Sequence, residues 1–190
     1  MPTITGAHSN VALELLGKAL ELAGKIHHPV YALLIGHNIG EAAQRLLKYG
    51  ADKVFVYDDP RLEYFKIEPY ANVFEDFIKK IKPSSVLVGA TNTGRSLAPR
   101  VAARFRTGLT ADCTALEIKE NTDLVQIRPA FGGNIMAQIV TQYTRPQLCT
   151  VRYKIFSAPL PLEHPAGEIE EMSIEPEKLE KMNRQLAACS

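Results

Sequence analysis

The chain has 190 residues, of which 46% are hydrophobic and 23% are charged. This composition is close to that of an average soluble globular chain and excludes a disordered, collagen-like or low-complexity protein. The 22 Lys and Arg residues nearly balance the 21 Asp and Glu residues, and the formal net charge is +1. The chain therefore has no overall basic field that would hold nucleic acid or an anionic membrane surface, and we expect neither partner.

Targeting and redox signals in the sequence are weak. No apolar run approaches the roughly 18 residues that a membrane span needs, and the first residues lack the pattern of a signal peptide. The three cysteines, Cys113, Cys149 and Cys189, do not have CxxC spacing. This usage indicates reduced thiols in the cytosol and favours neither a disulfide framework nor a zinc site. We therefore expect a cytoplasmic protein without a metal site.

The first 108 residues predict helices that alternate with strands. Three short apolar runs have the length of strands buried on both faces, at residues 30–36, 53–57 and 85–88. Apolar residues at helical spacing precede, separate and follow these runs, at residues 11–26, 38–50, 69–82 and 97–108. Strands that alternate with such helices predict βαβ units and a parallel sheet.

Specific residues mark the expected helix ends. Asn38 and Glu41 have the spacing of a near capping box, and Pro69 suits the first position of a helix. Gly50 and Gly108 fit the positions that follow a helix C-terminus. These residues predict where three of the four helices begin or end.

The pattern changes after Gly108. Residues 109–118 and 124–128 look extended and are joined by a polar turn, and residues 135–141 and 147–152 are two more strand candidates. We expect them to be antiparallel strands added to the parallel sheet. The fold class is therefore α/β, with a mainly parallel sheet, helices on both faces and antiparallel strands in the second half.

Residues 157–190 differ in composition from the rest of the chain because they are rich in Pro and Glu. They predict a linker or arm after a domain that spans residues 1–156, with a short helix between Pro176 and Leu186. A frayed tail is the alternative interpretation.

The loop Gly89–Ser96 is the strongest candidate site. It lies between a buried strand and a helix N-terminus, where open α/β sheets bind phosphates and other ligands. The candidate nucleotide-binding residues are Gly89, Thr91, Asn92, Thr93, Gly94, Arg95 and Ser96. The loop matches neither GxGxxG nor a Walker sequence. A structural interpretation therefore stays open, in which the polar residues cap the helix and Arg95 pairs with a carboxylate or a partner chain.

A second candidate is the segment Arg128-Pro-Ala-Phe-Gly-Gly-Asn134. Gly132 and Gly133 permit a bulge or sharp bend, which would place Arg128 and Asn134 near the rim of the sheet. A turn with a solvated Arg explains the segment equally well. Cys113 is predicted to be a buried structural thiol, because a nucleophile would need a positioned base. The sequence contains no convincing set of catalytic residues.

Several of these motifs, in this order, resemble the electron transfer flavoprotein alpha subunit. They are residues 49–54, 89–104, 107–113, 128–134 and 145–152. The resemblance covers residues 10–156 and implies a Rossmann-like N-terminal domain, similar to adenine nucleotide alpha hydrolases, that pairs with a beta subunit. It also implies that the pair carries electrons from flavin dehydrogenases such as acyl-CoA dehydrogenases, as in fatty acid β-oxidation, and that some members bifurcate electrons from NADH.

The sequence departs from this family in two places. The family's FAD lies mainly in a C-terminal domain, and the sequence stops where the linker to that domain is expected. We therefore expect FAD in the full-length parent and no tight FAD binding by this chain. The family's usual first strand is not recognisable in residues 1–9, and we expect the sheet to lack it.

Two functions follow from this comparison. The first is an electron carrier subunit rather than a catalyst by itself, with partner or structural roles for Arg95, Arg128, Gly132, Gly133 and Asn134. The second is a stand-alone module that binds an adenine nucleotide through Gly89–Ser96. An acyl- or phosphoryl-transfer enzyme is disfavoured, because the loop has neither a base nor a metal cluster beside it.

Overall fold

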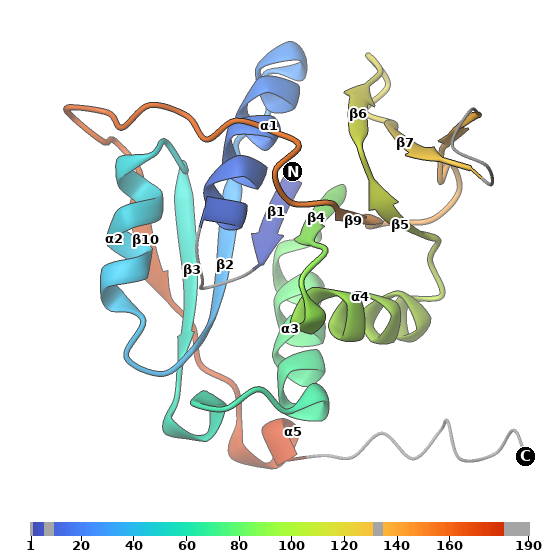
Figure 1. The fold of residues 1–190 in the computed structure, drawn as a ribbon. Coiled ribbons are helices and arrows are strands. Elements are labelled where there is room, and N and C mark those ends of the chain that lie inside the picture. Colours follow the sequence, from blue (N-terminus) through green and yellow to red (C-terminus); the bar gives the residue numbers. More distant parts are fainter. Residues whose placement is uncertain (1, 6–9, 131–134, 181–190) are drawn as a thin grey trace, which may run out of the picture.

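The fold is a main parallel sheet between two layers of helices, with a small antiparallel sheet attached (Figure 1). The computed structural model describes residues 2–5, 10–130 and 135–180. The main sheet has the order β10-β3-β2-β1-β4-β9-β5, and all six pairings are parallel. Its strands are β1 (Pro2–Thr5), β2 (Tyr31–Gly36), β3 (Lys53–Asp58), β4 (Ser85–Gly89), β5 (Leu109–Cys113), β9 (Gln147–Val151) and β10 (Glu168–Glu171).

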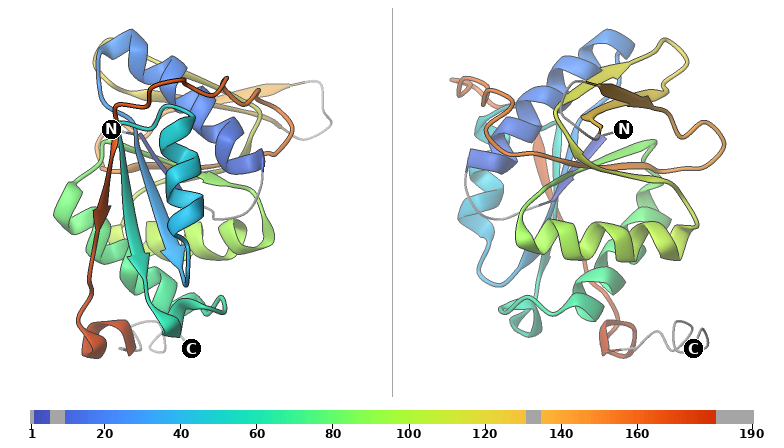
Figure 2. Two further views of the ribbon diagram at one scale, coloured as in Figure 1. Left: turned by 90° about the vertical axis from the view of Figure 1, so that its left-hand side faces the viewer. Right: turned by 45° about the vertical axis from the view of Figure 1, so that its right-hand side comes forward.

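Helices cover both faces of the main sheet, as the sequence predicts. Helices α1 (Asn10–Ile26) and α2 (Gly40–Lys48) pack on one face, and α3 (Ile67–Ile81) and α4 (Asn92–Phe105) pack on the other (Figure 2). Strand β2 shows the alternation, because Leu34 faces the α1 side and Leu33 faces the α3 side. A 3₁₀ turn, η1 (Pro60–Leu62), precedes α3. Within the described residues, no helix is long and apolar enough to cross a membrane.

The small sheet consists of β6 (Ala115–Ile118), β7 (Leu124–Pro129) and β8 (Met136–Ile139), all antiparallel. The expected hairpin between residues 109–118 and 124–128 is therefore confirmed. The expectation for β5 and β9 was wrong in direction: both strands join the main sheet in parallel, and β9 lies between β4 and β5. Short extended segments look alike in sequence whichever sheet they join.

Strand β1 corrects a second expectation. Residues 2–5 form a central strand that pairs with β2 on one side and β4 on the other. The sheet therefore does not lack its first strand, and β2 and β4 have no unpaired inner edge. The four residues are too few for a recognisable pattern, and the pairing itself is made by the backbone.

The arm after residue 156 adds to the main sheet. It crosses α1 and α2 (Figure 1) and donates the Leu162 N–H to the Lys48 carbonyl. It then forms β10 beside β3 and the short helix α5 (Pro176–Glu180) beside α3. Lys53 of β3 forms ion pairs with both Glu168 and Glu170 of β10. The acidic strand is thus stabilised by a cation from its neighbour.

Three helix ends differ from the sequence expectation. Helix α3 begins two residues before Pro69, which lies in the first turn, where its missing N–H costs no hydrogen bond. Helix α4 ends at Phe105, and the residue that follows it in the left-handed conformation is Arg106 rather than Gly108. Gly50, with φ +102°, follows α2 as expected. Asn38 is not the cap of α2, which begins after Ile39.

Asp58 of β3 supplies the acceptor at the N-terminus of α2. Its carboxylate accepts the N–H of Asn38 at 2.9 Å and the N–H of Ile39 at 3.0 Å. Desolvation acts to raise the pKa of Asp58, but these two donors and the neighbouring His37 together hold the pKa below its ordinary value. The contact joins the carboxyl end of a strand to the next helix along the sheet.

We predict that Asp58→Ala lowers the free energy of unfolding by about 1 kcal/mol, the usual effect of losing such an acceptor. Because the pKa is depressed in the folded state, this stabilisation is present above about pH 4 and is lost as the pH falls through the folded pKa. Thermal unfolding of both proteins at neutral and acidic pH measures the difference. A difference that stays constant with pH would contradict the assignment.

Candidate functional site

The loop Gly89–Ser96 lies at the carboxyl end of β4, at the position predicted from the sequence. Thr91 is the N-cap of α4, and its hydroxyl oxygen accepts the N–H of Gly94 at 3.1 Å. The Ser96 hydroxyl donates to the carbonyl of Asn92 at 2.9 Å. The side chains of Thr91 and Ser96 therefore stabilise the first turn of the helix, while Asn92 and Thr93 are exposed.

Gly94 allows the first turn of α4 to lie directly on the end of β4. A Cβ atom at Gly94 would be 1.9 Å from the carbonyl oxygen of Gly89 and 3.0 Å from a methyl group of Val88. No side chain fits in this space, and backbone cannot move aside cheaply. The requirement for glycine at residue 94 is explained by helix–strand packing.

Arg95 forms an ion pair with Asp112 of β5, with 3.0 Å between Nη2 and Oδ1. Asp112 lies in an irregular part of β5 with φ +57°, and its N–H donates to the Thr150 hydroxyl of β9 at 2.9 Å. The carboxylate neutralises the cation of Arg95. The ion pair that the structural interpretation requires is therefore present within the chain.

Two further backbone donors of this loop have partners. The Ala90 N–H donates to the Val151 carbonyl, and the Arg95 N–H donates to the Thr91 carbonyl, both at 2.8 Å. A phosphate cradle needs several free N–H groups and an uncompensated positive field. The bond from the Gly94 N–H to Thr91 and the pairing of Arg95 with Asp112 favour the structural interpretation of the loop.

The second candidate segment is only partly described. Arg128 is half-buried on β7, whereas Gly132, Gly133 and Asn134 lie outside the described residues. A contact with the Cys149 thiol, helped by the nearby charge of Arg128, lowers the pKa of Cys113. The same contact and burial raise the pKa of Cys149.

Both thiols are buried in the core on the α1 side. Cys113 therefore fits the predicted structural thiol, and Cys189 lies outside the described residues. Among the residues that the structure describes, no group of three or more His, Cys, Asp or Glu side chains could hold a metal ion.

An exposed apolar strand is the feature that sequence reasoning missed. Three residues at β8 are exposed: Ile135 is 64%, Met136 is 50% and Ile139 is 36% accessible. The strand pairs with β7 on one side. The sequence identified residues 135–141 as a strand candidate, but an apolar strand that faces solvent has the same pattern as a buried one.

A family model and several curated relatives match the chain. The model of the electron transfer flavoprotein domain matches residues 3–177. Subunit LctC of the lactate dehydrogenase (NAD(+),ferredoxin) of Acetobacterium woodii is 72% identical over 176 residues, which cover 93% of this chain and 42% of LctC. The electron transfer flavoprotein subunit alpha of Thermoanaerobacterium thermosaccharolyticum is 51% identical over 77% of this chain and 44% of its own length.

A third relative is the acryloyl-CoA reductase electron transfer subunit beta of Anaerotignum propionicum. It is 40% identical over 75% of this chain and 45% of its own length. The chain thus spans less than half the length of each of these three relatives.

We predict that Gly94→Ala lowers the free energy of unfolding by about 3 kcal/mol or more, since the added methyl group overlaps a backbone oxygen. Gly40→Ala is the matched control, because Gly40 also lies in the first turn of a helix and nothing lies within 4 Å of its added Cβ. That variant should be neutral or more stable by up to roughly 1 kcal/mol. Chemical denaturation compares the two, and equal effects would refute the packing role of Gly94.

Proposed function

Because this chain belongs to the electron transfer flavoprotein family, we propose that it is the N-terminal domain of an alpha subunit, which docks on a beta subunit in an electron-carrying heterodimer. The observation that carries this proposal is the match of residues 3–177 to the family model, together with relatives named alpha subunits. The chain then acts as a scaffold and docking part of a carrier.

The dehydrogenase partner follows from the relatives. The 72% identity to LctC supports a complex that exchanges electrons among lactate, NAD⁺ and ferredoxin, which would make the parent electron-bifurcating. The expected acyl-CoA dehydrogenase partner, and with it fatty acid β-oxidation, is the second candidate. The relative named acryloyl-CoA reductase electron transfer subunit beta favours it.

The family is one of flavoproteins, and we propose that the parent binds FAD outside the loop Gly89–Ser96. The support is geometric, because the Gly94 N–H and the Arg95 guanidinium, which could contact a phosphate, are bound to Thr91 and Asp112 instead. In this proposal Arg95 and Arg128 have structural roles. The reduced, buried state of Cys113 and Cys149 supports a cytoplasmic location.

The docking surface for the beta subunit is proposed to be β8 with Ile135, Met136 and Ile139. Exposed apolar side chains on a strand with a free edge suit a protein partner, because both the side chains and the backbone can pair with it. The remaining edge strand of the small sheet, β6, packs against α1 and is less suited.

We predict that the tagged full chain, co-expressed with the beta subunit of the same organism, retains that subunit through gel filtration. Met136→Glu should weaken the association at least tenfold, since a charge would be buried in an apolar contact. Tyr64→Glu is the control, because Tyr64 is 72% exposed and lies before α3, away from the small sheet. Failure of the unchanged chain to retain the subunit would overturn the proposed function.

The alternative function predicts a different result. Titration calorimetry of the chain with AMP should give no heat of binding at micromolar concentration, before or after Arg95→Ala. That substitution should lower the free energy of unfolding by only about 0.5 kcal/mol, because the ion pair is half-exposed. Micromolar AMP binding that is lost in Arg95→Ala would show that the nucleotide-binding module is the correct function.

A further inference from the structure

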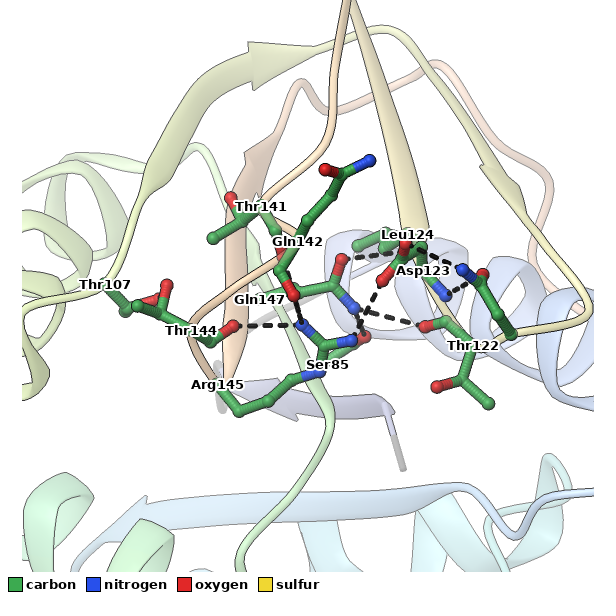
Figure 3. A network of polar contacts seen from close by, with 11 residues as sticks. Ser85, Thr107, Thr122, Asp123, Leu124, Thr141, Gln142, Thr144, Arg145 and Gln147 are labelled. Atoms are coloured by element: carbon green, nitrogen blue, oxygen red, sulfur yellow. Dashed lines mark hydrogen bonds and ion pairs between the residues drawn. The ribbon is translucent and has the colours of Figure 1, made fainter.

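The small sheet is attached to the main sheet by two chain crossings. β5 continues into β6 through Thr114, and β8 returns to β9 through residues 140–146. Polar side chains gather at the second crossing, beside the amino ends of β4 and β9 (Figure 3). The amino ends of these strands lie opposite the loop Gly89–Ser96, which follows the carboxyl end of β4. The network takes no part in the site described above.

Arg145 is the centre of the crossing. Its Nη1 donates to the carbonyl oxygens of Thr141, Gln142 and Thr144 at 3.0, 3.2 and 3.1 Å. Its Nη2 lies 2.9 Å from Oδ1 of Asp123, whose side chain is 8% exposed (Figure 3). One guanidinium thus closes the loop that leaves β8 and ties it to the residue before β7.

Gln147 makes the matching connection from the main sheet. It is the first residue of β9 and is fully buried. Its Oε1 accepts the N–H of Leu124 at 2.9 Å, and its Nε2 donates to the carbonyl of Thr122 at 3.1 Å. The side-chain amide therefore holds the backbone where β7 begins, as a neighbouring strand would.

A third contact fixes the crossing to the end of the α4–β5 connection. The Thr107 hydroxyl lies 2.8 Å from the Thr144 hydroxyl and donates to the Pro146 carbonyl at 2.9 Å. Gly108 also lies close to Thr141, since an added Cβ would be 2.8 Å from that hydroxyl oxygen. The crossing is thus held on both sides.

We propose that Asp123, Arg145 and Gln147 form an inter-sheet clamp that sets the orientation of the small sheet and so positions β8 for the beta subunit. The proposal rests on the docking surface given under the proposed function. Apolar packing between the sheets is non-directional and tolerates sliding. The planar guanidinium and the amide have fixed donor directions, and together they determine one angle between the sheets.

The contacts of Arg145 are expected to matter more for the position of the small sheet than for the stability of the main sheet. Although the side chain of Asp123 is 8% exposed, so that losing its cation would lower global stability as well, the Arg145 side chain is 37% exposed. Its contacts nevertheless hold three carbonyls of one short crossing. Loss of Arg145 should therefore alter the small sheet much more than the main sheet.

The test compares hydrogen exchange and beta-subunit affinity for the full chain and its variants. In Arg145→Ala, amides of β7 and β8 should exchange at least fivefold faster while those of β2 and β3 are unchanged, and the dissociation constant should rise at least tenfold. Arg145→Lys should give a smaller shift of both quantities, because an ammonium group keeps the charge but not the planar fork. Asp123→Asn reports on the same clamp if Arg145→Ala does not fold.

Two controls match these variants. Arg61→Ala removes a bidentate pair with Asp59 at a side chain that is 38% exposed, far from the small sheet, and should leave β7, β8 and the affinity unchanged. Leu62→Ala removes a fully buried side chain on the α3 side of the main sheet. It should lower the melting temperature and leave the affinity unchanged, which separates positioning from stability.

The outcomes are distinct. Unchanged exchange in β7 and β8 of the Arg145 and Asp123 variants overturns the clamp. Faster exchange with unchanged affinity overturns its role in docking. If the unchanged chain does not bind the beta subunit, the proposed function fails and its docking role falls with it, while the exchange data still decide whether the clamp orients the sheet.

Discussion

The insertion of β9 between β4 and β5 is the constraint on which the rest of the structure depends. The chain leaves the main sheet after β5, builds the small sheet and returns to an inner position of the main sheet. All five residues of β9 are buried and pair in parallel register with β4. A slip of one residue would turn each side chain to the opposite face of the sheet, so the register of β9 must be fixed at its ends.

Both ends of β9 make such contacts. At the amino end, the Gln147 side chain joins β9 to the start of β7. At the carboxyl end, the Thr150 hydroxyl accepts the N–H of Asp112, and the Val151 carbonyl accepts the N–H of Ala90. The candidate loop after β4 is thereby connected to β5 through β9. The Arg95–Asp112 ion pair makes a further connection between this loop and β5.

The sequence could predict those structural features that depend on residues close together in the chain. The apolar stripes of α1 and α3 and the β6–β7 hairpin follow from local spacing and were confirmed. The partners that come from distant elements could not be predicted. Asp58 caps α2 from β3, and Lys53 stabilises the acidic strand β10 from more than 100 residues away. For the candidate site, spacing gave the position of Arg95 but not its pairing with Asp112.

Two of the edge strands, β10 and β8, are chemically opposite, and this difference argues for one docking direction. At the far edge of the main sheet, β10 carries Glu168, Glu170 and Glu171, and charges of one sign discourage pairing with another strand. At the edge of the small sheet, β8 exposes Met136 and Ile139. In our proposal, the clamp at Arg145 and Asp123 sets the orientation of this sheet. A partner strand placed against β10 would have to desolvate carboxylates, two of which already bind Lys53. A partner placed against β8 removes apolar surface from water, which favours association by about 25 cal/mol for each Å² buried. Of these two edges, β8 is therefore the better suited to the proposed docking of a second subunit.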